Sequence, residues 1–140
     1  MYAVVGAVVI VIVVVLALYF GGVFNTTTTP ATPAKIFDTG SCSNATNCDF
    51  SPVPLSISTG TKVTWTSNST TPHTVTACST ANGADSTSCP TMNASGLPSF
   101  DSGSSGIPNG QTYSYTFSTA GTYYYYCRFH NWMHGQVNAS

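Results

Sequence analysis

Alternation of apolar and polar positions is the dominant pattern over most of the chain. Apolar side chains alternate with Ser and Thr through Lys62–Thr66 and Tyr113–Phe117, and Gly, Pro, Asn and Ser separate such runs. A period of two is typical of strands that bury one face. No stretch after Gly22 shows convincing helical periodicity. We therefore predict an all-β fold, a two-sheet antiparallel sandwich, over residues 36–140.

The N-terminal segment has a different pattern. Residues 1–24 form an uncharged apolar run rich in Val and Ile, long enough to cross a hydrocarbon core of about 30 Å as a helix. A cleaved secretory signal is disfavoured because a basic leading region is missing and the apolar run is too long. We predict a retained hydrophobic helix over 1–24, followed by an extended Thr/Pro linker over 25–35.

Charged residues are scarce, and this excludes several classes of function. The 140 residues include three Lys+Arg and four Asp+Glu, which gives 5% charged residues and a net charge of −1. Such a chain supports one domain with a modest core. It lacks the basic surface that nucleic-acid binding requires. The few carboxylates are scattered, with no pair suited to acid–base catalysis, so we do not expect an enzyme.

A metal site is indicated by the segment after a run of four tyrosines. Cys127, His130 and Met133 follow one another at intervals of three residues. We expect these three donors on one short loop at the end of the tyrosine strand. A thiolate, two imidazoles and a weak thioether form the donor set of a blue-copper site, whereas zinc does not favour a thioether. His73, which follows a strand-like segment, is the candidate for the second imidazole. His134 competes with Met133 for the fourth position.

Several short motifs resemble, in order and separation, those of the cupredoxin family. They are Phe50-Ser51-Pro52, Gly60–Trp65, Pro72–Val75, Phe100–Gly103, and Gly121–Tyr123 leading to Cys127. The resemblance covers about residues 36–137. The Cys-x2-His-x2-Met spacing is similar to that of amicyanin and of plastocyanin-like archaeal proteins.

The resemblance implies a Greek-key β-sandwich that binds one type 1 copper ion through His73, Cys127 and His130, with Met133 as the weak axial ligand. In this family the downstream His presents its outer edge to solvent through an apolar patch. Here Phe129 and Trp132 would supply that patch around His130, and redox protein partners would dock there.

One further position departs from the family pattern. Thr74 stands where many cupredoxins carry an Asn that links the two ligand loops. A hydroxyl can form a similar hydrogen bond between the two loops.

The cysteine count is odd, which leaves one thiol for another task in an exported chain. The five cysteines are Cys42, Cys48, Cys78, Cys89 and Cys127. Disulfides Cys42–Cys48 and Cys78–Cys89 would each close a short loop and leave Cys127 free, while the sequence alone leaves other pairings open. Disulfides would place the domain outside the cytoplasm.

Candidate glycosylation sites support the same location. Five Asn-x-Ser/Thr sequons are present: Asn25, Asn44, Asn68, Asn93 and Asn138. Glycans at such positions would keep a nearly uncharged surface soluble. We expect a cell-surface protein, on the outer face of the cytoplasmic membrane or in an extracellular filament, and an archaeal surface protein fits this combination.

Two functions remain open. The first is a membrane-anchored blue-copper electron-transfer protein that cycles between Cu(II) and Cu(I) close to membrane donors and acceptors. The second is a structural subunit of an extracellular type IV pilin-like filament, with glycosylated domains displayed outside. The two functions differ in whether the helix over 1–24 lies in lipid or packs against copies of itself in a homo-oligomer.

Overall fold

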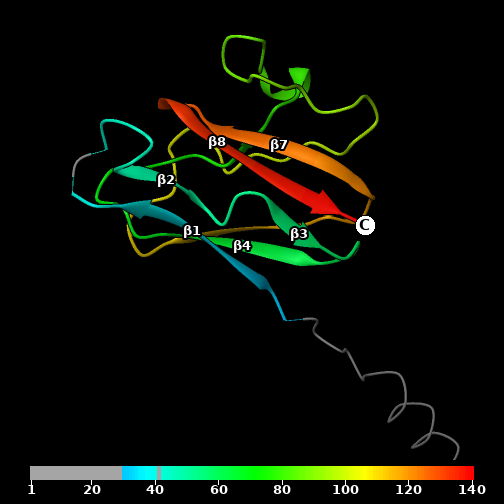
Figure 1. Cartoon of the computed structure of the whole chain (residues 1–140), viewed down its shortest axis with the longest axis horizontal. Helices are drawn as coiled ribbons and strands as arrows, with labels where there is room; N and C mark the ends of the chain where they lie inside the picture. Colours follow the sequence, from blue (N-terminus) through cyan, green and yellow to red (C-terminus); the bar gives the residue numbers. More distant parts are fainter. Residues whose placement is uncertain (1–29, 41) are drawn as a thin grey trace, which may run out of the picture.

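A sandwich of two four-stranded sheets is formed by residues 30–40 and 42–140, which are the residues that the computed structural model describes (Figure 1). One sheet has the strand order β2-β1-β4-β6 and the other β3-β8-β7-β5. The strands are β1 (Thr32–Asp38), β2 (Cys48–Ser51), β3 (Leu55–Ile57), β4 (Lys62–Ser67), β5 (Thr76–Ala77), β6 (Thr112–Thr116), β7 (Gly121–Cys127) and β8 (His130–Ala139). The predicted all-β fold is confirmed for this part of the chain.

Both sheets are mixed, so the prediction of a purely antiparallel sandwich was wrong. Strand β1 runs parallel to β4 and β3 runs parallel to β8, whereas the other pairs are antiparallel. The alternation of apolar and polar residues reports which face of a strand is buried, and it is the same for either direction. Strand direction therefore had to come from the long connections across the sandwich.

The sandwich begins earlier than predicted, inside the segment 25–35 that we expected to be a linker. Strand β1 starts at Thr32, and Ala34 and Ile36 are buried. Pro33 is tolerated because it lies in the part of β1 that pairs with β4 alone. The helix predicted over 1–24 lies outside the described residues. Within the ranges that are described, no helix is long and apolar enough to cross a membrane.

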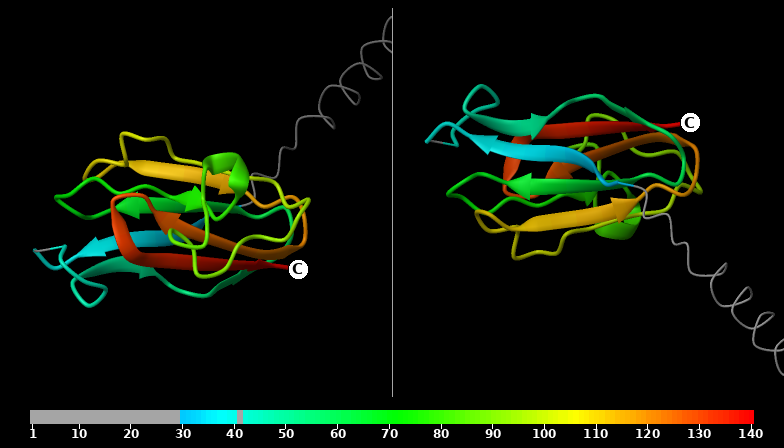
Figure 2. Two further views of the ribbon diagram at one scale, coloured as in Figure 1. Left: turned by 90° about the horizontal axis from the view of Figure 1, so that it is seen from above. Right: turned by 90° about the horizontal axis from the view of Figure 1, so that it is seen from below.

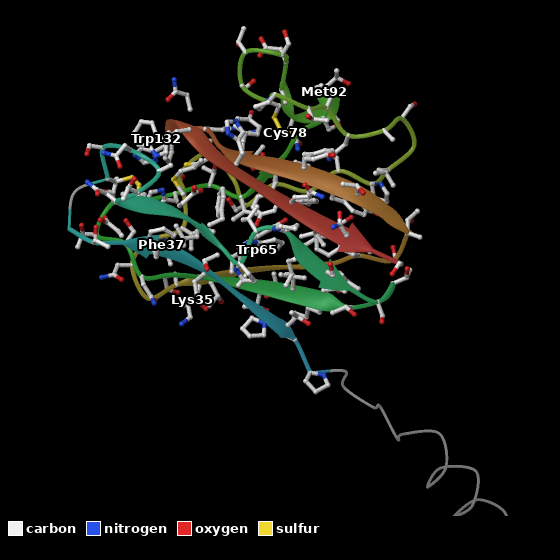
Figure 3. The ribbon with its side chains drawn as sticks, viewed as in Figure 1. Lys35, Phe37, Trp65, Cys78, Met92 and Trp132 are labelled. Atoms are coloured by element: carbon white, nitrogen blue, oxygen red, sulfur yellow. A yellow bond between two sulfur atoms is a disulfide. The ribbon has the colours of Figure 1, made fainter. Side chains whose placement is uncertain are left out.

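The core is built around Trp65, which is fully buried between the sheets (Figure 3). Its ring stacks on Tyr113 and Phe100, with centroids 5.9 and 6.1 Å away, and meets the edge of Tyr125 at 5.4 Å. Trp65 Nε1 donates a hydrogen bond to the Tyr125 hydroxyl at 3.2 Å. Because β4 and β7 belong to different sheets, this contact joins the two layers and satisfies the polar atoms of both rings.

The two ends of the sandwich differ in what they carry. The start of β1 and the C-terminal end of β8 lie at one end, and the turn between β7 and β8 lies at the opposite end (Figures 1 and 2). The loop after β5 contains a 3-10 turn, η1 (Thr80–Asn82), and covers β7 and β8. The disulfide Cys78–Cys89 closes this loop and packs with Tyr126 of β7.

Candidate metal centre

A two-residue turn, Arg128–Phe129, joins β7 to β8, and the strand register pairs Cys127 with His130. This differs from the predicted arrangement, in which the donors after the tyrosines share a loop, because His130 and Met133 lie in β8. The register shifts between Tyr126 and Cys127. Such irregularities re-aim a side chain at the end of a strand, and here the side chain is the candidate thiolate.

Three of the predicted ligands meet beside this turn. The candidate ligand atoms of His73, Cys127 and His130 all lie within 4.8 Å of one another. Cys127 Sγ is 3.8 Å from His73 Nδ1 and 3.5 Å from His130 Nδ1. His73 and Cys127 are buried, and His130 is 9% exposed. A buried thiol and two imidazole nitrogens therefore face a common point.

The alternation of β8 separates Met133 from its competitor. Met133 is fully buried, and its sulfur lies 3.9 Å from Cys48 Sγ. Cys48 Sγ in turn lies within 4.8 Å of a ring nitrogen of His73. His134 points to the other face of the sheet, where its Nε2 lies 3.0 Å from the Ser88 carbonyl oxygen. His134 thus contacts the disulfide-closed loop and is not the fourth donor.

Both histidines of the cluster are held neutral by burial. Removal from water lowers the pKa of His73 from 6.5 to about 4, and the proximity of His130 adds to this effect. Burial also lowers the pKa of His130. A neutral imidazole keeps one nitrogen lone pair, so each ring can offer Nδ1 to a metal ion at neutral pH.

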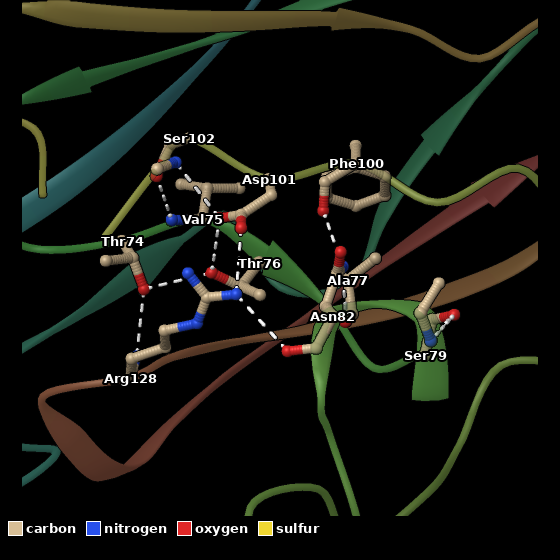
Figure 4. Close-up of polar contacts among 12 residues, drawn as sticks. Thr74, Val75, Thr76, Ala77, Ser79, Asn82, Phe100, Asp101, Ser102 and Arg128 are labelled. Carbon is tan, nitrogen blue, oxygen red and sulfur yellow. Dashed lines mark hydrogen bonds and ion pairs between the residues drawn. The ribbon is translucent and has the colours of Figure 1, made fainter. Parts of the chain in front are cut away.

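Thr74 links the two ligand-bearing segments (Figure 4). Its backbone N–H donates to Cys127 Sγ at 3.4 Å, and its hydroxyl accepts the Arg128 N–H at 2.9 Å. Thr76 Oγ1 lies 3.1 Å from both Thr74 Oγ1 and Asp101 Oδ1. The segment that carries His73 is therefore tied directly to the turn that follows Cys127.

An ion pair that the sequence did not reveal braces the same turn. Arg128 Nη2 lies 2.8 Å from Asp101 Oδ2 and 3.3 Å from the Asn82 carbonyl oxygen (Figure 4). Both charged side chains are about a quarter exposed, so the pair contributes about 1 kcal/mol or less. The only sequence signal was the place of Asp101 in the Phe100–Gly103 motif.

Phe129 and Trp132 flank His130 but differ in exposure. Phe129 is 49% exposed, whereas Trp132 is partly buried and packs against the core. The Trp132 ring lies 5.2 Å from the His130 ring, and the Phe129 ring lies at 6.5 Å. Gly106 has a positive φ of 76°, and a Cβ there would lie 2.9 Å from Phe129. Glycine therefore lets Phe129 lie close beside the His73 loop.

The structure contains both predicted disulfides, Cys42–Cys48 and Cys78–Cys89, and leaves Cys127 free and buried. The predicted sequons differ in their surroundings. Asn44 and Asn68 are exposed, whereas Asn93 and Asn138 are partly buried, and their side-chain oxygens accept hydrogen bonds from Tyr124 and Gln136. Asn25 lies outside the described residues.

Comparison with known proteins identifies the family. The model of copper-binding proteins of the plastocyanin/azurin family matches residues 38–140. This chain belongs to that family. No curated protein gives a significant match. Solved structures of cupredoxins have a similar fold, and each match covers most of the solved chain.

A purple cupredoxin from Nitrosopumilus maritimus is 25% identical, and the match covers 78% of this chain and 99% of that one with a TM-score of 0.57. A reduced amicyanin variant is 21% identical over 82% of this chain and 87% of its own, with a TM-score of 0.57. An oxidised amicyanin variant is 22% identical over the same shares, with a TM-score of 0.55. The amicyanins support the fold alone.

The donor atoms of this cupredoxin fit a single type 1 copper ion. The cluster combines one thiol, two neutral imidazoles and a nearby buried thioether, all within the same end of the sandwich. Soft sulfur together with imidazole is the set that copper prefers. The burial of the donors also provides the dry surroundings that such a site requires.

Proposed function

We propose that this cupredoxin is a blue-copper electron-transfer protein. Copper bound here would supply one-electron chemistry by cycling between Cu(II) and Cu(I). His73, Cys127 and His130 would hold the ion, and Met133 would provide the weak axial contact. The observation that carries the proposal is the meeting of one buried thiol with two imidazole nitrogens within 4.8 Å.

The chain's own contribution is to keep these donors in place. His130 and Met133 lie in β8, and the Thr74 link and the Arg128–Asp101 pair hold the neighbouring turn. Donors on braced strands move little when the charge of the site changes, which keeps reorganisation small. Because four donors from the protein would leave no open position for a substrate, we propose an electron carrier and not an enzyme.

Electrons would enter and leave through His130, whose imidazole is the slightly exposed member of the cluster. The exposed ring of Phe129 and the partly exposed ring of Trp132 would form the surrounding apolar docking surface. With a net charge of −1, attraction of redox protein partners over long distances would be weak. Docking would therefore depend on short-range apolar contact.

We further propose that residues 1–24 anchor the protein at the outer face of the cytoplasmic membrane. The two disulfides and the exposed sequons at Asn44 and Asn68 support a location outside the cytoplasm. The start of β1 lies at the end of the sandwich opposite the β7–β8 turn. An anchor joined there would leave the apolar surface of Phe129 and Trp132 around His130, here called the Phe129 surface, free for partners.

The same placement also supports the second candidate, a subunit of an extracellular pilin-like filament. If residues 1–24 packed against their copies in a filament core, the end of each domain that carries the β7–β8 turn would face away from that core. The two candidates are compatible. Imaging of the cell surface with and without the gene would show filaments in the second case alone.

The decisive experiment for electron transfer is the visible spectrum of the copper-loaded protein. We expect an intense thiolate-to-Cu(II) band near about 600 nm that disappears in Cys127→Ser. A Cys78→Ser/Cys89→Ser variant, which removes two sulfurs away from the cluster, should keep the band. A wild-type protein that binds copper without any such band would contradict the proposal.

A further inference from the structure

A fully buried hydroxyl lies directly behind His73. Ser69 Oγ is 2.8 Å from His73 Nε2, the ring nitrogen that faces away from Cys127, and 2.8 Å from Asp38 Oδ2. The Thr71 backbone N–H donates to the same hydroxyl at 3.0 Å. Asp38, which ends β1, and Ser69 and His73, which lie in the loop between β4 and β5, thus form a continuous hydrogen-bonded row.

The positions of the protons in this row follow from its carboxylate end. An ionised Asp38 can only accept hydrogen bonds, so the single hydroxyl proton of Ser69 must point to Asp38. Ser69 Oγ must then accept from His73, which places the imidazole proton on Nε2. The lone pair of His73 is left on Nδ1, the nitrogen that lies 3.8 Å from Cys127 Sγ.

Asp38 is suited to this role by its own hydrogen bonds. It ends β1, and its Oδ1 accepts the Gly40 backbone N–H at 2.7 Å. This bond and the one from Ser69 lower the pKa of Asp38. The carboxylate is therefore ionised at neutral pH and acts as a fixed acceptor with a negative charge.

Parallel pairing brings these residues together. Strand β1 is parallel to β4, with Ile36 opposite Ser67, so the two strands end at the same edge of the sheet. Asp38 ends the first strand, and Ser69 follows the end of the second. The Asn68 N–H donates to the Ile36 carbonyl oxygen at 2.9 Å and extends the pairing up to Ser69.

We propose that Asp38 and Ser69 are positioning residues of the metal centre. They fix His73 as the Nε2–H tautomer, aim the Nδ1 lone pair at the metal position and strengthen the imidazole as a donor through the charge of Asp38. The part that concerns copper rests on the proposed function. The part that concerns the tautomer does not.

The tautomer is measured in the copper-free protein by ¹⁵N NMR of the histidine side chains. In wild type we expect the His73 proton on Nε2, with exchange against solvent slowed by burial and by Ser69. Ser69→Ala removes the acceptor, so we expect mixed tautomers and faster exchange. Ser114→Ala is the control, because that hydroxyl pairs with Thr64 on the outer face of its sheet and its loss should leave the His73 signals unchanged.

Copper binding tests the second part through Ser69→Ala and Asp38→Asn. Loss of such outer partners lowers metal affinity by about 10–100-fold, and we expect this loss for Ser69→Ala with partial rescue by Ser69→Thr. Ser69→Ala and Asp38→Asn should both raise the reduction potential, because a weaker imidazole donor destabilises Cu(II) more than Cu(I). Asp85→Asn removes the same charge from a loop whose carboxylate bonds only Thr87 and Ser88 among the described residues, and it should change neither quantity.

An unchanged His73 tautomer in Ser69→Ala overturns the proposal. So does a copper affinity within about twofold of wild type in both Ser69→Ala and Asp38→Asn. If Ser69→Ala does not fold, Asp38→Asn decides the matter, because Asp38 is partly exposed and its replacement keeps the shape. Failure of the blue-copper assignment is recognised separately, since the tautomer would then persist without the visible band.

Discussion

The burial of His73 affects both the stability of the fold and the capacity of the imidazole to bind a metal ion. Its complete burial disfavours the charged imidazolium and lowers its pKa to about 4. The neutral form that burial selects is also the form that binds a metal ion. The lone pair on Nδ1 is therefore available at pH values where an exposed histidine would be protonated.

The same shift makes the stability of the copper-free protein depend on pH. Between about pH 6.5 and about pH 4 the unfolded chain binds a proton at His73 that the folded chain excludes, so the free energy of unfolding falls as pH falls. At about 1.4 kcal/mol per pKa unit, the free energy of unfolding falls by about 3 kcal/mol over this range. Urea unfolding at about pH 7 and about pH 4.5 measures it. His73→Asn should remove most of this dependence, and an equal loss in the variant would show that other groups cause it.

The link at Thr74 joins two elements, and its hydroxyl gives a direct test. Thr74→Val keeps the shape but leaves the Arg128 N–H without its acceptor, which we expect to lower the free energy of unfolding by about 1–3 kcal/mol. Copper should also dissociate faster, because the turn after Cys127 is less restrained. Thr64→Val, on the outer face of β4, is the matched control. Equal stability losses in the two variants would argue against a special role for the Thr74 link.

Strand β8 owes its close contact with β7 to Gly135. The two strands pair Tyr125 with Gly135, and a Cβ at Gly135 would overlap the Tyr125 ring. The ring can occupy this space only because glycine has no side chain, and from there its hydroxyl reaches Trp65. A strand glycine thus permits the contact between the two sheets.

Gly135→Ala should displace Tyr125 and lower the free energy of unfolding by about 1–3 kcal/mol or more. Gln136→Ala is the control, because it changes the neighbouring position of β8, where the side chain is partly exposed. In a double-mutant cycle, Tyr125→Leu should relieve part of the cost of Gly135→Ala. Strict additivity of the two substitutions would contradict the proposed overlap.

The molecule as a unit carries almost no net charge, which governs how it meets a partner. Its net charge is −1, so Coulomb forces between two copies are weak, and added salt screens little. If the Phe129 surface mediates electron exchange, contact there is mainly apolar. Shape and desolvation would then determine the rate.

We expect the rate of electron self-exchange between oxidised and reduced copies, measured by NMR line broadening, to change less than about threefold over the range from low to physiological salt. Phe129→Glu should slow self-exchange by placing like charges face to face, while the visible spectrum stays unchanged. Val53→Glu is the control, because Val53 is the other exposed large apolar residue among those described and lies outside the His130 cluster. An equal effect of both substitutions would locate the exchange elsewhere.

What the sequence determined by itself was local: which segments bury one face, which side chains can bind copper, and that an odd cysteine remains. Alternation through Lys62–Thr66 and the series Cys127, His130 and Met133 carry this information, because burial and donor chemistry are properties of single residues and short runs. The two disulfides were expected because each closes a short loop, and the resemblance to cupredoxins singled out the position of Thr74.

Tertiary structure alone decided the direction of the strands and everything that depends on it. Alternation does not distinguish parallel from antiparallel neighbours, so the pairing of β1 with β4 was not foreseen. The meeting of Asp38 and Ser69 behind His73 was missed for the same reason. Whether His134 faces the metal or the opposite side of β8 was likewise fixed by the register with β7. Contacts between segments distant in sequence depend on how strands pair, and no single segment carries that information.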